Sequence, residues 1–456
     1  MQTTSLKLPA VGARPKGHLL RVFGMAFALA IAIGTTIGGG ILHTPGDIAA
    51  LLPNVWLIMA VWLFGGINAL LGATAFSELG AMIPCAGGPY VFARRALGDY
   101  AGFFVGYINW LQDCAICAGL ALLIGEYSGV LLPSLNGHTT AVAFAVYGTL
   151  AAMQWHRVRW GGQVQTITTV AKTVGLGALV VAAFVLPHST ASTTVATPPL
   201  PHGAAWMLAL VLALQGVFFT YNGYQYSVYF GEELRDPGRE IPRSMFRGLA
   251  MIIVLYLLLN AAFLYVIPLA QLAHDSFAGG TVAGILFGER GDRIIRAIVI
   301  VSVLGVINTS IMSGPRTLLA MGRDRLFAHQ ATRVNAGGTP SVALLLSVML
   351  GTAFLVSGTF TVVLQITVAL MVVLYLLMFV SVWVLRWREP DTPRPYRAWG
   401  YPWSSIAGFA IGLVFLIGVA FGDPRHSLIA LALLVASYPL YRGVVWLRKD
   451  TIGNES

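Results

Sequence analysis

The chain has 456 residues, of which 57% are hydrophobic and only 10% are charged. A soluble globular protein carries about 25% charged residues, so most of this surface is expected to face the lipid bilayer. The formal net charge of +10 suggests a nucleic-acid partner at first sight, but the positions of the basic residues along the chain exclude that function.

Apolar runs of about 20 residues, the length that crosses a bilayer as a helix, recur along the chain. They cover roughly residues 22–51, 55–80, 100–131, 138–154, 163–186, 205–230, 247–269, 294–320, 341–357, 360–385, 403–421 and 427–446. The sequence therefore predicts an all-α integral membrane protein with twelve transmembrane helices.

Lysine and arginine lie almost entirely on one side of these predicted spans. When the connections are assigned alternately to the two sides, 23 of the 28 basic residues fall on the side of the N-terminus and 4 on the other. The remaining one, Lys172, lies inside a span. By the positive-inside rule we expect the chain in the cell membrane with both termini in the cytoplasm, and no nucleic-acid partner.

The first and sixth predicted spans contain glycine-rich breaks where an uninterrupted helix would be expected. The first break runs from Gly34 to Gly40, and the second from Thr220 to Gly223. In a bilayer each unsatisfied backbone N–H or C=O costs several kcal/mol, so irregular backbone is expected only where it lines a cavity or meets a ligand. Breaks at corresponding positions of two halves are typical of the binding site of a secondary transporter.

The spacing of the breaks predicts an internal repeat. They lie about 185 residues apart, which suits a unit of five spans used twice, and an odd number of spans inverts the second copy. In chain order we predict a cytoplasmic tail over 1–21, a first repeat over 22–186, a second over 205–385, two further spans within 403–446 and a cytoplasmic tail over 447–456. The long outer connections, 187–204 and 270–293, are expected to be solvent-exposed loops.

The first break resembles the glycine signature of the amino acid–polyamine–organocation (APC) superfamily. Three other stretches are similar to the same family at matching places: Glu78–Tyr90, Gly231–Arg243 and Arg394–Tyr396. The resemblance covers roughly residues 20–400. It implies a LeuT-type 5+5 inverted repeat, with discontinuous helices 1 and 6 and two extra helices, that works as an amino acid transporter.

Three consecutive glycines in the first break are candidates for binding the substrate. Freed N–H groups at the start of a half-helix act like about half a positive charge, and glycine lets a carboxylate approach them closely. We therefore expect Gly38, Gly39 and Gly40 to bind the substrate carboxylate, and the carbonyls of Thr36 and Ile37 to be left free for its α-ammonium. The alternative is a glycine face for tight helix packing, which needs fewer glycines than these.

The second break supplies further candidates. The resemblance places Phe219 at the position of an aromatic residue that closes over the substrate, although simple core packing is the alternative. Thr220, Tyr221 and Gly223 are expected to supply unwound carbonyls or side-chain contacts. Asn222 stands where relatives often have a small residue, so we expect it to narrow or polarise the pocket.

Lys172 is expected to take part in ion coupling, because a lysine at the bilayer centre costs about 2.5–3.5 kcal/mol and usually marks an ion or proton pathway. It lies about nine residues from the inner end of its span, too deep to snorkel easily. Its surroundings resemble sodium-independent APC members, in which a lysine of the fifth helix replaces a bound ion and bridges the first and eighth helices. Asn308 is the expected partner on the eighth helix. A buried lysine can also carry a proton.

Other ionisable residues lie in or near the spans. Asp113, near the middle of the third span, could receive a cationic substrate group or pair with Lys172. His43 follows the first break and is expected to line an outer vestibule, unless it is a structural histidine. Three glutamates at predicted cytoplasmic helix ends are expected to form ion pairs with nearby arginines: Glu78, Glu232 and Glu233.

The sequence contains no phosphate-binding loop, HExxH motif, nucleophile elbow or cofactor fingerprint, so we expect neither an enzyme nor a cofactor. The cysteines Cys85, Cys114 and Cys117 are too few for a metal site. We therefore predict a sodium-independent secondary transporter of amino acids that works by alternating access, through proton symport or exchange. Asp113 motivates an organic-cation or polyamine carrier as one alternative, and a membrane amino-acid sensor that does not translocate is another.

Overall fold

The computed structural model describes residues 19–187, 196–358, 360–422 and 424–453, and the regular secondary structure of these residues is helical apart from three isolated β-bridges. The expected all-α fold is therefore confirmed. In chain order the helices are α1 (Met25–Thr36), α2 (Gly40–Leu51), α3 (Val55–Met82), α4 (Pro89–Leu97), α5 (Asp99–Leu131), η1 (Pro133–Leu135), α6 (Thr139–His156), α7 (Val158–Val185), α8 (Ala204–Tyr221), η2 (Tyr224–Tyr229), α9 (Pro237–Val266), α10 (Leu269–Leu272), α11 (Ala278–Phe287), α12 (Glu289–Arg323), η3 (His329–Thr332), α13 (Ser341–Ser357), α14 (Phe360–Arg388), α15 (Trp403–Gly422) and α16 (Pro424–Gly453).

Ten helical segments in the described part of the chain are long and apolar enough to cross a membrane. Each coincides with one of the predicted spans. The other two predicted spans are also helical, as α6 with 18 residues and α13 with 17. The chain is thus a multi-pass membrane protein.

Both predicted breaks are present. The first span is divided into α1 and α2, which are separated by residues 37–39. The sixth is divided into α8 and the short 3-10 helix η2, which are separated by Asn222 and Gly223. Because both helices are interrupted, the backbone N–H and C=O groups at the breaks need hydrogen-bond partners outside their own helix.

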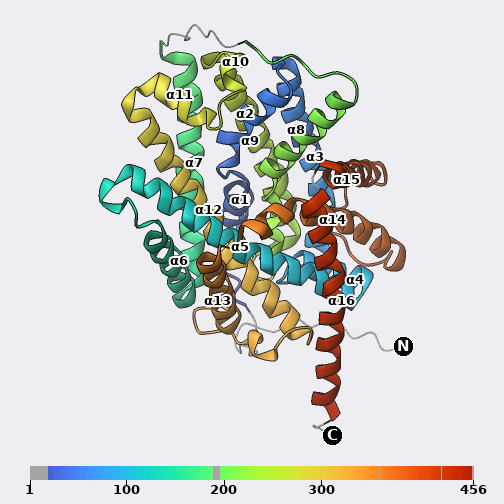
Figure 1. Cartoon of the computed structure of the whole chain (residues 1–456). Coiled ribbons are helices and arrows are strands. Elements are labelled where there is room, and N and C mark those ends of the chain that lie inside the picture. The colour runs from blue at the N-terminus through green and yellow to red at the C-terminus, as the bar shows by residue number, and fades with distance from the viewer. Residues whose placement is uncertain (1–18, 188–195, 359, 423, 454–456) are drawn as a thin grey trace.

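The break in the first span is enclosed by helices from both predicted repeats. In Figure 1, α1 lies at the centre of the bundle. It packs against α7, α9, α12 and η2. The two longest helices, α5 and α12, pack against each other beside it.

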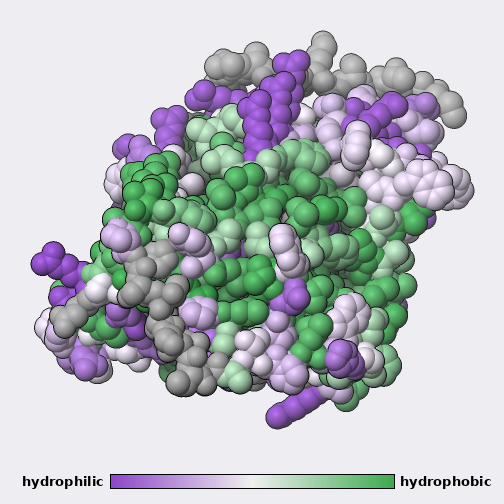
Figure 2. Space-filling view, turned by 90° about the horizontal axis from the view of Figure 1, so that it is seen from above, coloured by the Kyte–Doolittle hydropathy of each residue, from purple (hydrophilic) through white to green (hydrophobic). Residues whose placement is uncertain are grey.

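The outer connection over residues 270–293 differs from the expected exposed loop. It contains α10 and α11, and it continues into the start of α12. Residues of α11, including Ala278 and Val282, are fully buried, because α11 packs over α2. Figure 2, which looks down on this end of the molecule, shows hydrophobic residues across much of the face. The other long connection, 187–204, lies partly outside the described residues.

The three glutamates form the expected ion pairs. Glu78 contacts Arg386 at 2.6 Å and Arg394 at 3.3 Å. The other pairs are Glu232 with Arg323 at 2.6 Å, and Glu233 with Arg316. Arg316, assigned from the sequence to a connection, lies inside α12 and is only 2% exposed. Arg316 is thus a buried cation in addition to Lys172. Its bidentate pairing with the fully buried Glu233 compensates its charge.

Candidate functional site

The two breaks touch each other. A Cβ atom added at Gly223 would lie 2.7 Å from the carbonyl carbon of Thr35 and from the backbone nitrogen of Thr36. Gly223 also has φ = +130°, a conformation that other residues rarely adopt. The glycine therefore lets the break after α8 press directly against the end of α1, and two distant stretches of sequence form one site.

Open space lies in front of the first two glycines of the triplet. Among the described residues, a Cβ at Gly38 would meet no atom within 4 Å, and one at Gly39 would meet only Val299 at 4.0 Å. Tight helix packing therefore does not explain these two glycines, whereas Gly40 does lie close to Thr220, with a Cβ distance of 3.1 Å. No side chain caps the start of α2 at Gly39. The start of α2 is thus without a side-chain cap and lies next to open space, as an anion-binding helix start would require.

The carbonyls of Thr36 and Ile37 are not free, contrary to the expectation from the sequence. The Thr36 oxygen accepts from the hydroxyl of Tyr256 at 3.0 Å and from the N–H of Gly38 at 2.9 Å. The Ile37 oxygen accepts from the ammonium of Lys172 at 2.8 Å. The physical reason is that a buried carbonyl without a partner is costly, so neighbouring helices supply donors.

Lys172 of α7 is completely buried, so its ammonium does not snorkel to either surface. It donates to the carbonyl oxygens of Gly34, of Ile37 at 2.8 Å and of Ser302 at 3.1 Å. The ammonium therefore links the end of α1 to α12. Because a lysine has three N–H donors, these three acceptors satisfy it fully.

Asn308 is not the α12 partner of Lys172. Its amide group donates to the Gly161 carbonyl at 3.0 Å and to Gln165 at 3.1 Å, and accepts from Gln154 at 2.8 Å. Asn308 lies about 9 Å along the helix from Ser302, which supplies the carbonyl instead. It ties α12 to α6 and α7.

Phe219 is 47% exposed, whereas its neighbour Phe218 is 9% exposed. Phe218 packs on Phe64 and Phe415, with ring centroids 6.2 and 4.9 Å away. Core packing therefore describes Phe218 and not Phe219. The ring of Phe219 therefore lies at the surface of the described structure, one residue before Thr220.

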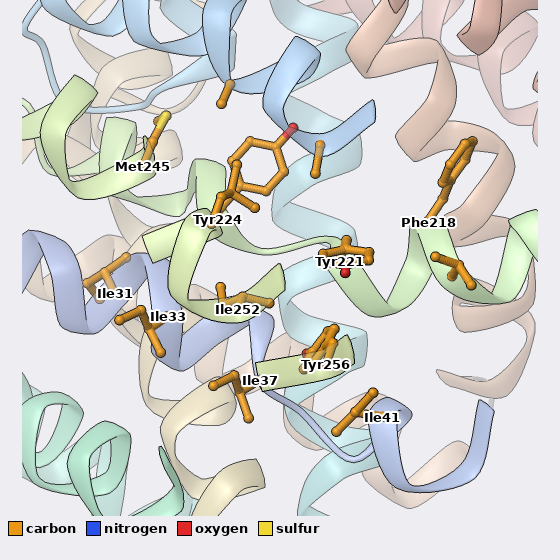
Figure 3. Close-up of a cluster of buried hydrophobic side chains, with 14 of the residues drawn as sticks. Ile31, Ile33, Ile37, Ile41, Phe218, Tyr221, Tyr224, Met245, Ile252 and Tyr256 are labelled. Carbon is orange, nitrogen blue, oxygen red and sulfur yellow. The ribbon is translucent and has the colours of Figure 1, made fainter. Parts of the chain in front are cut away.

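The other residues of the second break are tied to their neighbours. The Thr220 hydroxyl contacts that of Thr44 at 3.2 Å, and the Thr220 carbonyl accepts from Tyr256 at 3.3 Å. The Tyr221 ring packs against Tyr256, at 5.1 Å between centroids, as Figure 3 shows. Tyr221 thus makes its contact through its ring, while the expected free carbonyl of Thr220 is occupied.

Asn222 forms hydrogen bonds with polar side chains next to the break. Its side-chain oxygen accepts from Gln225 at 2.7 Å and from the hydroxyl of Tyr375 at 3.2 Å. Next to it, a pocket open to the surroundings lies between α3, α8, η2, α14 and α15. Tyr221, Tyr224 and Tyr375 line it.

Asp113 is 2% exposed and does not pair with Lys172. Its carboxylate accepts from the hydroxyl of Tyr226 at 2.9 Å and from that of Ser313 at 2.7 Å. Within the described residues it forms no ion pair, so its partners are hydroxyl groups from η2 and α12.

His43 fits the structural alternative. Its Nδ1 atom lies 2.7 Å from the Ser276 carbonyl, and its ring stacks on Phe277 with centroids 4.6 Å apart. These contacts fix α2 to the segment that precedes α11.

Sequence reasoning missed Tyr256 of α9, whose hydroxyl reaches both breaks through the carbonyls of Thr36 and Thr220. The signal was a tyrosine inside an apolar span, because a buried hydroxyl needs a hydrogen-bond partner. The same reasoning fits Tyr226, which holds Asp113.

Two interrupted helices that touch inside a multi-pass bundle, beside a buried lysine, are typical of a membrane transport protein. The model of the amino acid permease family matches residues 23–437. The chain belongs to this family, which confirms the resemblance seen in its motifs.

Several transporters are similar to the chain over most of their length. It is 28% identical over 440 residues to the serine/threonine exchanger SteT of Bacillus subtilis, covering 93% of this chain and 97% of the relative. It is 26% identical over 466 residues to the human large neutral amino acids transporter small subunit 2, and the match covers 97% of this chain and 84% of the relative. It is 25% identical over 462 residues to the mouse Asc-type amino acid transporter 1, and the match covers 94% of this chain and 82% of the relative.

Proposed function

We propose that this amino acid permease is a sodium-independent secondary transporter that works by alternating access. In this proposal twelve helices cross the membrane with both termini in the cytoplasm, and the first ten form a LeuT-type 5+5 inverted repeat. The observation that carries the proposal is the ammonium of Lys172, held among carbonyls of α1 and α12.

The environment of Lys172 supports independence from sodium. Carbonyl oxygens freed by a broken helix are the ligands that such transporters use for sodium. Here the ammonium already occupies the carbonyls of Gly34 and Ile37 and reaches Ser302 on α12. A fixed positive charge therefore supplies the contact between helices that a bound cation would otherwise supply.

The space before Gly38 and Gly39 supports an amino acid as the substrate. A carboxylate placed there would accept from the N–H groups at the start of α2 and lie near the positive end of its dipole. Phe219 would cover the substrate from α8. The relative named as a serine/threonine exchanger supports small amino acids as the first substrates to test, and exchange as the first mode.

Contacts at one end of the molecule support alternating access. Phe23 exchanges backbone hydrogen bonds of 3.0 Å with Glu233 and Arg235, just after η2. Together with the buried pair of Glu233 and Arg316, these contacts join the segment before α1 to the segment after η2, which is what we expect of a state closed at that end. A transport cycle would have to open this closure and close the other end.

Uptake into proteoliposomes tests the proposal. We expect saturable exchange of labelled serine or alanine for internal amino acid, at an unchanged rate when Na⁺ is replaced by K⁺ or choline. A strict sodium requirement would contradict the role given to Lys172. Inhibition by polyamines alone would favour the cation carrier, and ligand-induced thermal stabilisation without flux would favour the sensor.

A further inference from the structure

The first part of α9 carries a stripe of exposed arginines. Arg239, Arg243 and Arg247 recur every fourth residue, which places them on one face of the helix, and all three are exposed. The same face continues with exposed apolar residues: Met251 (49%), Val254 (57%) and Leu258 (44%). We call the three basic residues the arginine stripe.

The length of α9 places the arginine stripe at the membrane surface. The helix has 30 residues and ends at Val266. The hydrocarbon core of a bilayer is about 30 Å thick and takes about 20 helical residues. Counted back from Val266, the core ends near Arg247. Arg243 and Arg239 then lie about 6 and 12 Å further out, in the headgroup region.

A second segment adds a cation and an interfacial aromatic residue beside the stripe. Tyr396 packs against Phe246, which lies between two of the arginines, with ring centroids 5.7 Å apart. The neighbouring Arg397 is exposed, and Trp399 is 81% exposed. Exposed tryptophans are typical of the headgroup level, so this segment independently indicates the same depth as α9.

Among the described residues, the charges of the stripe have almost no ion-pair partners. Arg243 and Arg247 form no ion pair with any described residue, and Arg239 contacts only Asp236, at 3.7 Å with both side chains exposed. Glu240, on the same turn, is used to accept the N–H of Asp236 at 3.2 Å. Like charges at this spacing repel each other, so the face favours an external anion.

We propose that the arginine stripe and Arg397 bind the headgroup of an anionic phospholipid such as phosphatidylglycerol. The guanidinium groups pair with the phosphate oxygens, for which arginine has a matched bidentate geometry. The acyl chains lie along the apolar continuation of the same face. That continuation identifies a lipid as the anion, because free phosphate would gain nothing from Met251 or Val254. Since α9 packs against α1 and α3, the lipid supports the helices that carry the site.

Thermal unfolding in nanodiscs tests this site. The full chain is reconstituted in phosphatidylcholine with increasing phosphatidylglycerol, and the rise in Tm is measured. We expect the phosphatidylglycerol fraction needed for half of this rise to increase about 25-fold in Arg243→Gln/Arg247→Gln, since each arginine near an anionic surface contributes about fivefold. The control Arg290→Gln/Arg293→Gln removes two exposed arginines at the start of α12 and is expected to respond like the wild type.

Three outcomes would overturn the proposal. One is an unchanged response in Arg243→Gln/Arg247→Gln, and another is an equal loss in the control, which would assign the effect to total charge. The third is equal stabilisation of the wild type by inorganic phosphate, which would make this a site for soluble anions. The variant Arg243→Lys/Arg247→Lys keeps the charge but not the bidentate geometry, so its response should lie between those of the wild type and Arg243→Gln/Arg247→Gln, which separates lipid binding from a folding defect. None of these measurements depends on transport.

Discussion

Replacing Lys172 with alanine is the sharpest test of how the first break is held. The substitution leaves three carbonyl oxygens, of Gly34, Ile37 and Ser302, without the donor that they share. Each buried acceptor left unsatisfied costs about 1–3 kcal/mol, so the free energy of unfolding should fall by roughly 3 kcal/mol or more. The vacated space is lined by carbonyl oxygens, which are ligands for hard cations. We therefore expect Na⁺ to raise the Tm of Lys172→Ala relative to choline, and to leave the wild type unchanged.

Exchange and thermal unfolding are measured on the same preparations. Lys172→Ala should lose most exchange activity, because α1 and α12 are no longer linked. Thr169→Val is the matched control, since Thr169 lies one turn away on α7 and donates to the Ala30 carbonyl of α1 at 2.9 Å. It should lose about 1 kcal/mol of stability and keep exchange. Wild-type exchange by Lys172→Ala would refute the reasoning, and so would a sodium effect on the wild type of the same size.

Three further predictions concern the breaks. Gly39→Val should leave a folded protein, because the space in front of Gly39 is open. The added side chain should weaken substrate binding at least tenfold in a thermal-shift titration. Wild-type affinity would show that the glycines do not belong to the site. Phe219→Ala should lower the exchange rate more than substrate affinity and hardly change Tm, since the ring is 47% exposed; an unchanged rate would show that the ring does not close over the substrate. Gly223→Ala should lower the free energy of unfolding by several kcal/mol in denaturation assays. The added Cβ would lie 2.7 Å from the backbone of Thr35 and Thr36, and alanine rarely adopts the φ of +130° found at this position. A wild-type Tm would mean that the two breaks are not pressed together.

The sequence predicted the membrane spans and their breaks better than it predicted the contacts between them. Apolar length and glycine content located the spans and both breaks, since these depend only on local composition. The charge of Lys172 in an apolar run marked it as a candidate for the site, because a buried ammonium needs partners from other helices. Its partner could not be chosen in the same way. Asn308 was expected because it is a polar side chain on the eighth predicted span, but the acceptor is the backbone carbonyl of Ser302, which carries no compositional signal.

Contacts between distant parts of the chain also explain two wrong predictions: the free carbonyl of Thr36 and the exposed loop over residues 270–293. Whether Thr36 presents a free oxygen depends on Tyr256, which is more than 200 residues away in the chain. The segment around Ala278 was assigned to a loop because it is too short to cross the membrane. A helix that packs over α2 needs only one buried face, so length alone could not identify it.

The contacts around the two breaks fall into two groups that would behave differently in the proposed transport cycle. Tyr256 donates to Thr36 and Thr220, so one residue of α9 holds both breaks in a fixed relation. By contrast, Thr35 meets Thr309 of α12 at 3.1 Å through a single hydroxyl pair, and Ser302 of α12 contributes one of the three acceptors of Lys172. Alternating access requires the substrate site to persist while the two openings exchange. The hydrogen bonds of Tyr256 are therefore the ones that should be retained throughout the cycle, and those that reach α12 are the ones that should be exchanged.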